Sequence, residues 1–360
     1  MQNRLHPKLL WLTNLPAPYR FEIWNHLADS LDLEVAFLLK RKNWRHWPAP
    51  EDVAWKSHFL SFNSIRIKEY DVIPSFRGAR KLLRDKDFAI IGGWESPMYI
   101  VSIFLARKWK IPVILFYGSF SGTHRFAKGP IARFRKWIMS KPDRFCTISK
   151  KSTDALVNLG VEPSKILTLF NCVDGEWFHA FAEKNLIPDA PGHKFIFVGQ
   201  LLKRKNLENT IRAFSEAREE LDTLTIAGGG NLESELRALV NSLGLREVVR
   251  FVGNLNKAHL AKLFTESNTL ILASVVEVWG LVVNEALASG LHVVVSTQCG
   301  VSQLIKDMHG VEVCEINPSS IAAALTRSRK NYTGHIRNPE ILQYSPRLFA
   351  EKLYSFLLAI

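Results

Sequence analysis

The sequence has no apolar run that approaches the ~18 residues needed to cross a lipid bilayer. The longest apolar stretch, residues 98–106, is closed by three cations within residues 107–110, so a buried helix explains it better. The first sixteen residues, MQNRLHPKLLWLTNLP, hold only a short apolar segment broken by Asn14 and Pro16. This pattern argues against a cleaved export signal.

Cysteine is also scarce, and the four cysteines are too far apart to form a CxxC pair. Their spacing argues against a disulfide framework and against a zinc site, and favours buried thiols in a reducing compartment. Together with the lack of an export signal, it predicts a cytoplasmic protein. The four residues are Cys146, Cys172, Cys299 and Cys314.

Basic residues outnumber acidic residues only in the first half of the chain. Residues 1–174 contain 28 Lys and Arg against 15 Asp and Glu, whereas residues 175–360 contain 19 of each class. The whole net charge of +13 therefore belongs to the first half. Such an asymmetry indicates an anionic partner, which can be a nucleic acid, an anionic membrane surface or a phosphorylated substrate; a merely soluble basic surface is the plainer alternative.

The length of 360 residues and the 47% hydrophobic, 22% charged composition predict a soluble globular protein of two domains. Short β-branched runs alternate with amphipathic stretches, which is typical of parallel sheets covered by helices. No sequence repeat or low-complexity tract interrupts this alternation. We expect strands near residues 9–14, 33–39, 88–93, 111–118, 144–149, 194–200, 224–230, 248–253, 269–274 and 292–297.

The predicted fold class is α/β, with two doubly wound Rossmann-like lobes that face each other across a cleft. We place the first lobe at residues 1–175 and the second at residues 190–340, with a polar, irregular segment between them up to about Pro191. Residues 341–360 end in an amphipathic helix that can fold back on the first lobe.

Two carboxylates flank a predicted helix start in the segment EVWGLVVNEALASG, residues 277–290. Glu277 follows a strand, Gly280 opens a helix, and Glu285 lies one to two turns inside it. The main-chain amides of Gly280, Leu281 and Val282 can bind a diphosphate, because a helix N-terminus offers unbonded N–H groups and a partial positive charge. The carboxylates can accept hydrogen bonds from sugar hydroxyls. On spacing alone, two ordinary helical glutamates explain the pattern equally well.

Glycine turns after two strands favour the binding interpretation. In VGQLLKRKN, Gly199 follows one strand directly, and AGGGNLESEL repeats the pattern on another. Glycine there lets the backbone approach a ligand closely. The three successive cations Lys203, Arg204 and Lys205 follow the first turn, where they can meet a diphosphate.

These segments resemble, in order and spacing, the family 4 retaining glycosyltransferases of the GT-B fold. The resemblance is carried by VGQLLKRKN, IAGGGNLESELRALVNSLGL, VRFVGNL, ILASVVEVWGLVVNEALASG and YSPRLFAEKL. It covers residues 194–300 well and residues 8–175 more loosely, through TNLPAPYR, the KIPVIL strand, SKKSTDALVNLGV and the NCVD turn. The spacing of the two glutamates is weak evidence alone and strong evidence together with the glycine turns and the basic loop.

The resemblance implies roles for the residues of the second lobe. Glu277 would contact the transferred sugar and Glu285 the ribose of a nucleotide. Lys205 would hold the diphosphate and stabilise its charge as it leaves, which is electrostatic catalysis. Retaining members need no metal or other cofactor, and the leaving phosphate is thought to help deprotonate the acceptor.

The chain departs from the family pattern at the glycine turn that contains Gly199. The family usually has an arginine after the first glycine, where this chain has Gln200. Either Arg204 replaces the charge that Gln200 lacks, or the donor binds more weakly. Asn254 and Leu255, after the VRFVG strand, would lie near the base of the nucleotide.

The resemblance assigns the acceptor to the first lobe. NLPAPYR stands where many members have a glycine-rich loop, and its Tyr19 and Arg20 would meet a phosphate or the acceptor. Many members also have a histidine after the strand that corresponds to IPVILFYG. This chain has Gly118 and Ser119 there, with His124 a few residues later as a catalytic candidate; an ordinary loop histidine is the plainer interpretation.

Basic and aromatic residues mix in residues 124–144 and again in KRKNWRHW, residues 40–47. Such a mixture is typical of a helix that lies on an anionic membrane, which favours peripheral attachment to the inner face of the cell membrane and a lipid-linked acceptor. The alternative is a helix that packs its apolar face inward. Asp85-Lys86-Asp87 spells the D-x-D of metal-dependent transferases, but its basic surroundings favour plain surface charge.

The predicted function is therefore transfer of a sugar from a nucleotide diphosphate sugar to a glycan or lipid-linked acceptor, with retention of configuration, in surface polysaccharide or lipopolysaccharide assembly. A basic nucleic-acid-binding protein is an alternative of another class, but no recognised nucleic-acid motif supports it, so no nucleic acid is expected as a partner. A nucleotide-sugar epimerase or oxidoreductase is the other alternative, although no GxGxxG follows the first strand.

Overall fold

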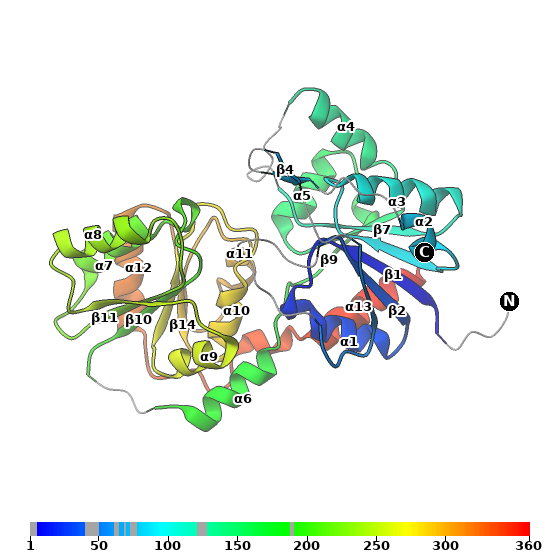
Figure 1. The fold of residues 1–360 in the computed structure, drawn as a ribbon. Coiled ribbons are helices and arrows are strands. Elements are labelled where there is room, and N and C mark those ends of the chain that lie inside the picture. Colours follow the sequence, from blue (N-terminus) through cyan, green and yellow to red (C-terminus); the bar gives the residue numbers. More distant parts are fainter. Residues whose placement is uncertain are drawn as a thin grey trace. The chain divides into compact units, whose positions relative to one another are not determined.

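A computed structural model describes residues 6–39, 50–60, 65–67, 70–72, 78–120, 128–187 and 191–360. The chain forms two compact units, residues 1–171 with 346–360, and residues 172–345 (Figure 1). We refer to them as the first and second lobe. The cysteines Cys146, Cys172, Cys299 and Cys314 are all buried thiols.

The first lobe contains, within the described residues, a parallel seven-stranded sheet in the order β3-β2-β1-β6-β7-β8-β9. Its central strands consist of almost entirely buried apolar residues, as expected when helices cover both faces of a parallel sheet. The strands are β1 (Lys8–Thr13), β2 (Asp32–Phe37), β3 (Lys56–Phe59), β6 (Phe88–Ile91), β7 (Val113–Tyr117), β8 (Arg144–Thr147) and β9 (Ile166–Thr168), beside a small antiparallel pair, β4 (Ile65–Ile67) and β5 (Tyr70–Val72).

The helices of the first lobe include one from the far end of the chain. α13 (Pro346–Leu358) packs against α1, and both lie beside the β1 and β2 end of the sheet (Figure 1). Arg144 Nη1 donates to the Phe356 carbonyl at 3.0 Å, and its guanidinium lies 4.7 Å from the Phe356 ring centroid. The other helices are η1 (Pro18–Arg20), α1 (Phe21–Ala28), α2 (Ala79–Leu83), α3 (Pro97–Lys108), α4 (Pro130–Ile138), α5 (Lys150–Asn158) and η3 (Pro163–Lys165).

The second lobe has a parallel six-stranded sheet in the order β12-β11-β10-β13-β14-β15. Numbered within the lobe, this is the 3-2-1-4-5-6 order of the Rossmann fold. The predicted class of two Rossmann-like lobes is therefore confirmed. The strands are β10 (Lys194–Val198), β11 (Thr223–Ala227), β12 (Val249–Gly253), β13 (Thr269–Leu272), β14 (His292–Ser296) and β15 (Val311–Cys314).

Helices cover both faces of this second sheet. α7 packs beside α8 and α12, whereas α6 packs beside α9 and α10 on the other side (Figure 1). The helices are α6 (Gly175–Asn185), η4 (Lys203–Lys205), α7 (Leu207–Ala217), α8 (Glu233–Ser242), α9 (Lys257–Thr265), α10 (Leu281–Ala288), α11 (Ser302–Ile305), α12 (Pro318–Lys330) and η5 (Glu340–Gln343).

The prediction of an irregular segment up to Pro191 is wrong for residues 175–185, which form α6. The Asp174 carboxylate caps this helix by accepting from the Trp177 amide at 3.2 Å. The Trp177 ring stacks on Phe181 and lies under the Lys257 ammonium, 4.0 Å from the ring centroid. Contacts with α9 and α10 thus add to a helix that its local residues already favour, through the Asp174 cap and the Trp177–Phe181 pair one turn apart.

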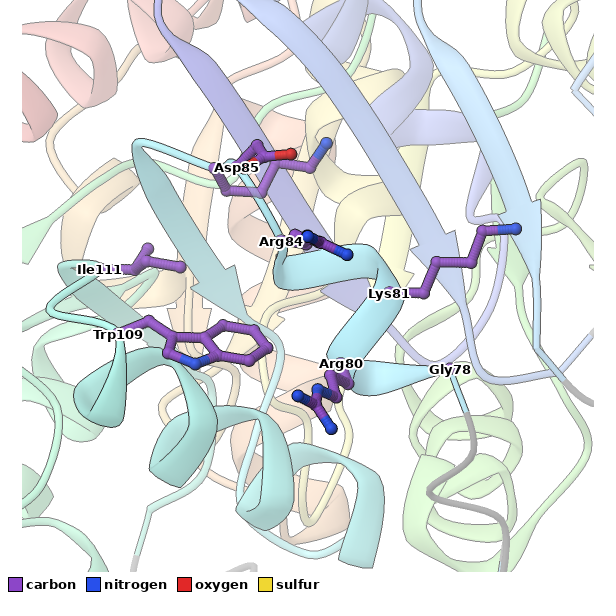
Figure 2. Close-up of a pocket in the computed structure, with 8 residues that line it drawn as sticks. Gly78, Arg80, Lys81, Arg84, Asp85, Trp109 and Ile111 are labelled. Carbon is purple, nitrogen blue, oxygen red and sulfur yellow. The ribbon is translucent and has the colours of Figure 1, made fainter.

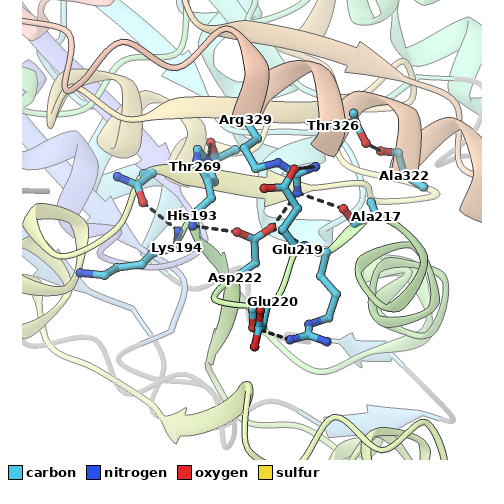
Figure 3. A network of polar contacts seen from close by, with 12 residues as sticks. His193, Lys194, Ala217, Glu219, Glu220, Asp222, Thr269, Ala322, Thr326 and Arg329 are labelled. Atoms are coloured by element: carbon cyan, nitrogen blue, oxygen red, sulfur yellow. Dashed lines mark hydrogen bonds and ion pairs between the residues drawn. The ribbon is translucent and has the colours of Figure 1, made fainter. Parts of the chain in front are cut away.

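A polar network closes the amino edge of the second sheet (Figure 3). The buried Asp222 carboxylate accepts from the His193 amide at 2.8 Å and from Arg329 Nη1 at 2.6 Å. Arg329 also pairs with Glu219 at 2.9 Å, and His193 Nε2 lies 2.8 Å from Thr269 Oγ1. The buried charge of Asp222 is thus matched within the protein, as buried charges require.

Candidate functional site

The opposite, carboxyl edge of the second sheet gathers the predicted site residues. β10 and β13 are neighbours here although they are not consecutive, so the strand order reverses between them. In open parallel sheets a ligand binds outside the carboxyl ends of the strands at such a switch point. The loop after β10 carries the cations 203–205, and the loop after β13 carries Glu277.

Lys205 and Glu277 form an ion pair at this switch point. Lys205 Nζ donates to Glu277 Oε2, and Arg204 Nη1 donates to the same oxygen at 3.3 Å. The Lys205 side chain is 10% exposed and that of Glu277 is 14% exposed, whereas Arg204 is 40% exposed. Two cations thus share one carboxylate at a partly desolvated position.

The backbone around η4 holds the two loops together. Asn206 has a left-handed conformation, with φ of 62°, and its side-chain amide donates to the Ala273 carbonyl at 3.0 Å. The Val275 amide donates to the Arg204 carbonyl at 2.8 Å. These bonds tie the end of β10 to the end of β13 and so fix Lys205 beside Glu277.

The glycine turns after β10 and β11 pack directly on each other. A Cβ atom at Gly228 would lie 1.9 Å from the Gly199 carbonyl oxygen, so no larger residue fits there. Lys205 Nζ lies 3.6 Å from the position that a Cβ of Gly199 would take. Gln200 follows Gly199 directly in this turn. It precedes the cations 203–205 by a few positions in the sequence, and its side-chain amide carries no charge.

The turn after β12 completes this edge. The Gly228 amide donates to the Gly253 carbonyl at 2.7 Å, and Asn254 Nδ2 lies 3.3 Å from the place of a Cβ at Gly229. Asn254 is exposed and Leu255 is partly exposed. Both therefore lie beside the glycine turns, at the far side of the edge from Glu277.

α10 begins beside Glu277 as predicted. Gly280 precedes it with φ of 100°, and within the described residues no side chain caps this N-terminus. The first-turn amides of Leu281 and Val282 therefore face outward from the helix start, where the helix dipole attracts an anion. The Gly300 amide donates to the Glu277 carbonyl at 3.0 Å, which anchors the loop before the helix.

Glu285 lies one turn inside α10 and is partly buried. Burial raises the pKa of its carboxyl to about 7, although the nearby Lys257 ammonium lowers it. Near neutral pH this group can therefore accept hydrogen bonds as a carboxylate or donate one as an acid.

The predicted acceptor residues lie in the first lobe, after β1. The Arg20 guanidinium lies 4.4 Å from the Phe116 ring centroid and 5.8 Å from those of Trp11 and Tyr19. Arg20 thus packs on the carboxyl end of β1 and β7 through cation–π contacts. His124 and residues 40–47 lie outside the described residues.

The structure adds two candidate site residues in the first lobe, Trp94 and Glu95, that were not predicted from the sequence. β1 and β6 flank the switch point of this sheet, and β6 is followed by Gly92, Gly93, Trp94 and Glu95. The exposed Glu95 raises the pKa of Tyr99 and Tyr117, although burial is the larger cause for both. A glycine pair directly after a strand was the signal that points to Trp94 and Glu95.

A cavity of about 800 Å³ in the first lobe lies away from the switch point (Figure 2). Arg80, Arg84 and Asp85 line it, next to Trp109 at the amino edge of the sheet. Asp87 instead accepts from the Lys8 amide at 2.8 Å. Because Asp85 and Asp87 have different surroundings, the structure favours the surface-charge interpretation of this D-x-D. In the described part of the chain no cluster of three or more His, Cys, Asp or Glu could hold a metal ion.

Comparison with family models identifies both lobes. Residues 26–177 match the model described as Glycosyltransferase Family 4, and residues 181–352 match the model described as Glycosyl transferases group 1. The chain belongs to these GT-B glycosyltransferases. The family agrees with the GT-B glycosyltransferase part of the resemblance drawn from the glycine turns and the two glutamates.

Individual relatives of these GT-B glycosyltransferases match over parts of the chain. An uncharacterized glycosyltransferase of Methanocaldococcus jannaschii is 38% identical over 134 residues, which cover 37% of this chain and 34% of that one. An N-acetylgalactosamine-N,N'-diacetylbacillosaminyl-diphospho-undecaprenol 4-alpha-N-acetylgalactosaminyltransferase of Campylobacter jejuni is 35% identical over 159 residues, or 44% and 42% of the two chains. The matches span about a third to somewhat over half the length of the first curated relatives.

The fold is shared over the full length with solved GT-B structures. HepE of Anabaena, crystallised in complex with UDP, superposes with a TM-score of 0.74 over 98% of this chain and 100% of that one, at 13% identity. Within the described residues, no helix combines the length and the apolar character needed to cross a membrane.

Proposed function

We propose that the chain transfers a sugar from a nucleoside diphosphate sugar to a glycan or lipid-linked acceptor, with retention of configuration and without a metal ion. The observation that carries this proposal is the pairing of Lys205 and Arg204 with Glu277 at the switch point, beside the start of α10. Cations and helix amides suit a diphosphate, and carboxylates suit sugar hydroxyls.

In this proposal the diphosphate binds Lys205, Arg204 and the amides of Gly280, Leu281 and Val282. Glu277 then exchanges part of its contact with the cations for hydroxyls of the transferred sugar, and Glu285 accepts from the ribose. Asn254 and Leu255 border the base, with Gly199 and Gln200 next to the diphosphate. The UDP bound to the Anabaena HepE supports a nucleoside diphosphate as the ligand.

The chemical step breaks the bond between the anomeric carbon and the diphosphate oxygen and forms one to an acceptor oxygen. The acceptor proton passes to the leaving diphosphate, whose growing negative charge Lys205 and Arg204 stabilise. Tyr19 and Arg20 are the proposed acceptor residues, together with Trp94 and Glu95 at the switch point of the first sheet. His124 remains a candidate from the sequence alone.

The acceptor class and the biological setting are proposals of the same kind. The name of the Campylobacter relative specifies a diphospho-undecaprenol acceptor, which supports a lipid-linked acceptor here. We therefore propose a role in bacterial surface polysaccharide or lipopolysaccharide assembly on the cytoplasmic side of the membrane.

The first experiment is a thermal-shift screen with UDP, GDP, ADP and NAD. Stabilisation by one nucleoside diphosphate, and none by NAD, is the expected result, because a ligand that binds only the folded state raises its melting temperature. Stabilisation by NAD alone would reject the proposal. The same diphosphate then identifies the donor for transfer assays, in which a chelator should leave the rate unchanged and NMR of the product should show the anomeric configuration of the donor.

A further inference from the structure

Helix α4 in the first lobe has an unusual distribution of buried and exposed residues. Its buried residues are Arg135 and Ile138, whereas Ile131, Phe134 and Trp137 are 41%, 40% and 47% exposed. A helix that only covers a sheet buries its aromatic residues and exposes its arginines. α4 therefore exposes Ile131, Phe134 and Trp137 to solvent. The alternative interpretation of the sequence, a helix that packs its apolar face inward, predicts that these side chains are buried.

The exposed side chains form one continuous patch with a neighbouring helix. Phe104 of α3, 39% exposed, has its ring centroid 5.6 Å from that of Trp137. Trp137 also lies 5.6 Å from Phe134, and the Lys141 ammonium lies 4.7 Å from the Trp137 ring centroid. We call these three rings, together with Ile131 one turn before Phe134 on the same helix, the aromatic patch. Contiguous apolar surface of this kind marks an interaction site more often than scattered single residues do.

Positive charge surrounds the aromatic patch and negative charge is absent from its sequence. Residues 97–120 and 128–142 contain eight Lys and Arg and no Asp or Glu. Lys128, Arg133 and Lys136 are exposed, and no carboxylate within the described residues forms a salt bridge with them. The inward side of α4 is fixed instead by Arg135, whose guanidinium lies 5.7 Å from the Trp94 ring centroid.

We propose that the aromatic patch and its surrounding cations dock the first lobe on an anionic lipid bilayer. Phe and Trp side chains enter the boundary between headgroups and acyl chains, where the indole N–H remains hydrated, while lysine and arginine bind the lipid phosphates. A protein or nucleic-acid partner would pair the cations equally well, but the cluster of four apolar side chains among cations fits a surface that is apolar beneath a layer of anions. The proposal does not depend on the transfer reaction.

The test is sedimentation of the full chain with vesicles, without donor or acceptor. Vesicles of phosphatidylcholine mixed with phosphatidylglycerol should bind the protein, and phosphatidylcholine alone should bind it far less. The double variant F134S/W137S should lower the partition coefficient for the mixed vesicles by roughly tenfold or more. The matched control is L186S/I187S, because Leu186 and Ile187 are 48% and 45% exposed in the second lobe; it should bind as the wild type does.

A second measurement locates Trp137 itself. Vesicles with bromine-labelled acyl chains should quench part of the tryptophan fluorescence of the wild type and less of that of W137F, a variant that keeps an aromatic ring. Circular dichroism confirms that each variant is folded. Equal binding by F134S/W137S and the wild type would overturn the proposal, as would no binding of the wild type to anionic vesicles. Loss of a dimer in the variant, without vesicle binding by the wild type, would assign the patch to a contact between two copies instead.

Discussion

The two edges of the second sheet use charged residues in opposite ways. At the amino edge, Asp222 is satisfied by Arg329 and by two backbone amides, so its charge is matched within the protein (Figure 3). At the carboxyl edge, Lys205 and Arg204 share one carboxylate beside glycine turns and an uncapped helix start. The comparison teaches that buried charge alone does not mark a binding site. The surroundings decide, because only the carboxyl edge offers additional donors directed at a common point.

The largest expected effect is on stability, at the amino edge. Asp222→Ala leaves the Arg329 guanidinium, whose side chain is 17% exposed, without its buried partner. Removal of one partner of a buried pair costs about 3–5 kcal/mol, measured as the free energy of unfolding in urea. The control is Glu219→Ala, since Glu219 contacts the same arginine but is 71% exposed; its cost should stay below about 1 kcal/mol. Equal losses in the two variants would contradict the assignment of Asp222.

Next in size is the effect of Lys205→Ala at the carboxyl edge. Turnover should fall about 10²–10³-fold, as when one preorganised charge-stabilising donor is removed from an active site. Lys203→Ala is the matched control, because Lys203 belongs to the same short helix but is exposed. Steady-state kinetics should show near-wild-type turnover for the control. If Lys205→Ala kept full turnover, the site would lie elsewhere.

Glu277→Gln should have a smaller effect, which differs between binding of the nucleoside diphosphate and transfer of the sugar. The amide does not neutralise Lys205 and Arg204, so both cations become more available to a diphosphate. Calorimetric titration should therefore give unchanged or tighter binding of the nucleoside diphosphate, while sugar transfer falls by roughly tenfold or more because a sugar contact is weakened. A parallel loss of binding and transfer would show that Glu277 acts only as a structural partner.

The last effect concerns Glu285 and depends on pH. Its folded pKa of about 7 lies above the ordinary 4.5, so the folded state retains a proton between these values that the unfolded chain has lost. Stability therefore falls as pH rises through this window, and the full cost is present above pH 7. The rise of the pKa from 4.5 to about 7 corresponds to about 3 kcal/mol of cost for the ionised carboxylate. Glu285→Gln should therefore raise the melting temperature by about 5–10 °C at pH 8 and leave it unchanged near pH 4.

The same residue gives a binding test of the ribose role. If the ionised carboxylate accepts from ribose hydroxyls, affinity for the nucleoside diphosphate should increase with pH up to about 7 in the wild type. The Glu285→Gln variant should bind more weakly and lose this dependence. A pH profile identical in the two proteins would place the ribose away from Glu285.

Much of the second lobe could be predicted from its sequence. Runs such as TLIL and HVVVS are short, apolar and bounded by turns, and they became the buried strands β13 and β14. The helix α6 was missed although its Asp174 cap and Trp177–Phe181 spacing are local signals; only the contact of Trp177 with Lys257 depends on a distant residue. The strand β15, VEVC, was also missed, since an alternating run of four residues carries a weak signal.

The features of the candidate site likewise divide into those that could be predicted from the sequence and those that could not. Glycine after a strand and glutamate near a helix start are local features, so the sequence could predict Gly199, Glu277 and Glu285 as site residues. It did not show that Arg204 and Lys205 would share the Glu277 carboxylate, because these residues are about 72 positions apart in the chain. In the first lobe, the glycine pair before Trp94 and Glu95 is a local signal, but only the strand order, which places β6 beside β1, puts these residues at a switch point.

The sequence by itself determined the α/β class, the glycine turns, the helix start at Gly280 and the excess of cations in the first lobe, because each follows from local composition or from residues close in the chain. The tertiary structure alone decided which charges meet. It satisfied Asp222 inside the protein, joined Lys205 to Glu277 at a switch point, and turned Phe134 and Trp137 of α4 outward while Arg135 went inward. The physical reason is that burial and pairing depend on neighbours brought together by strand order and helix packing, which no local pattern encodes.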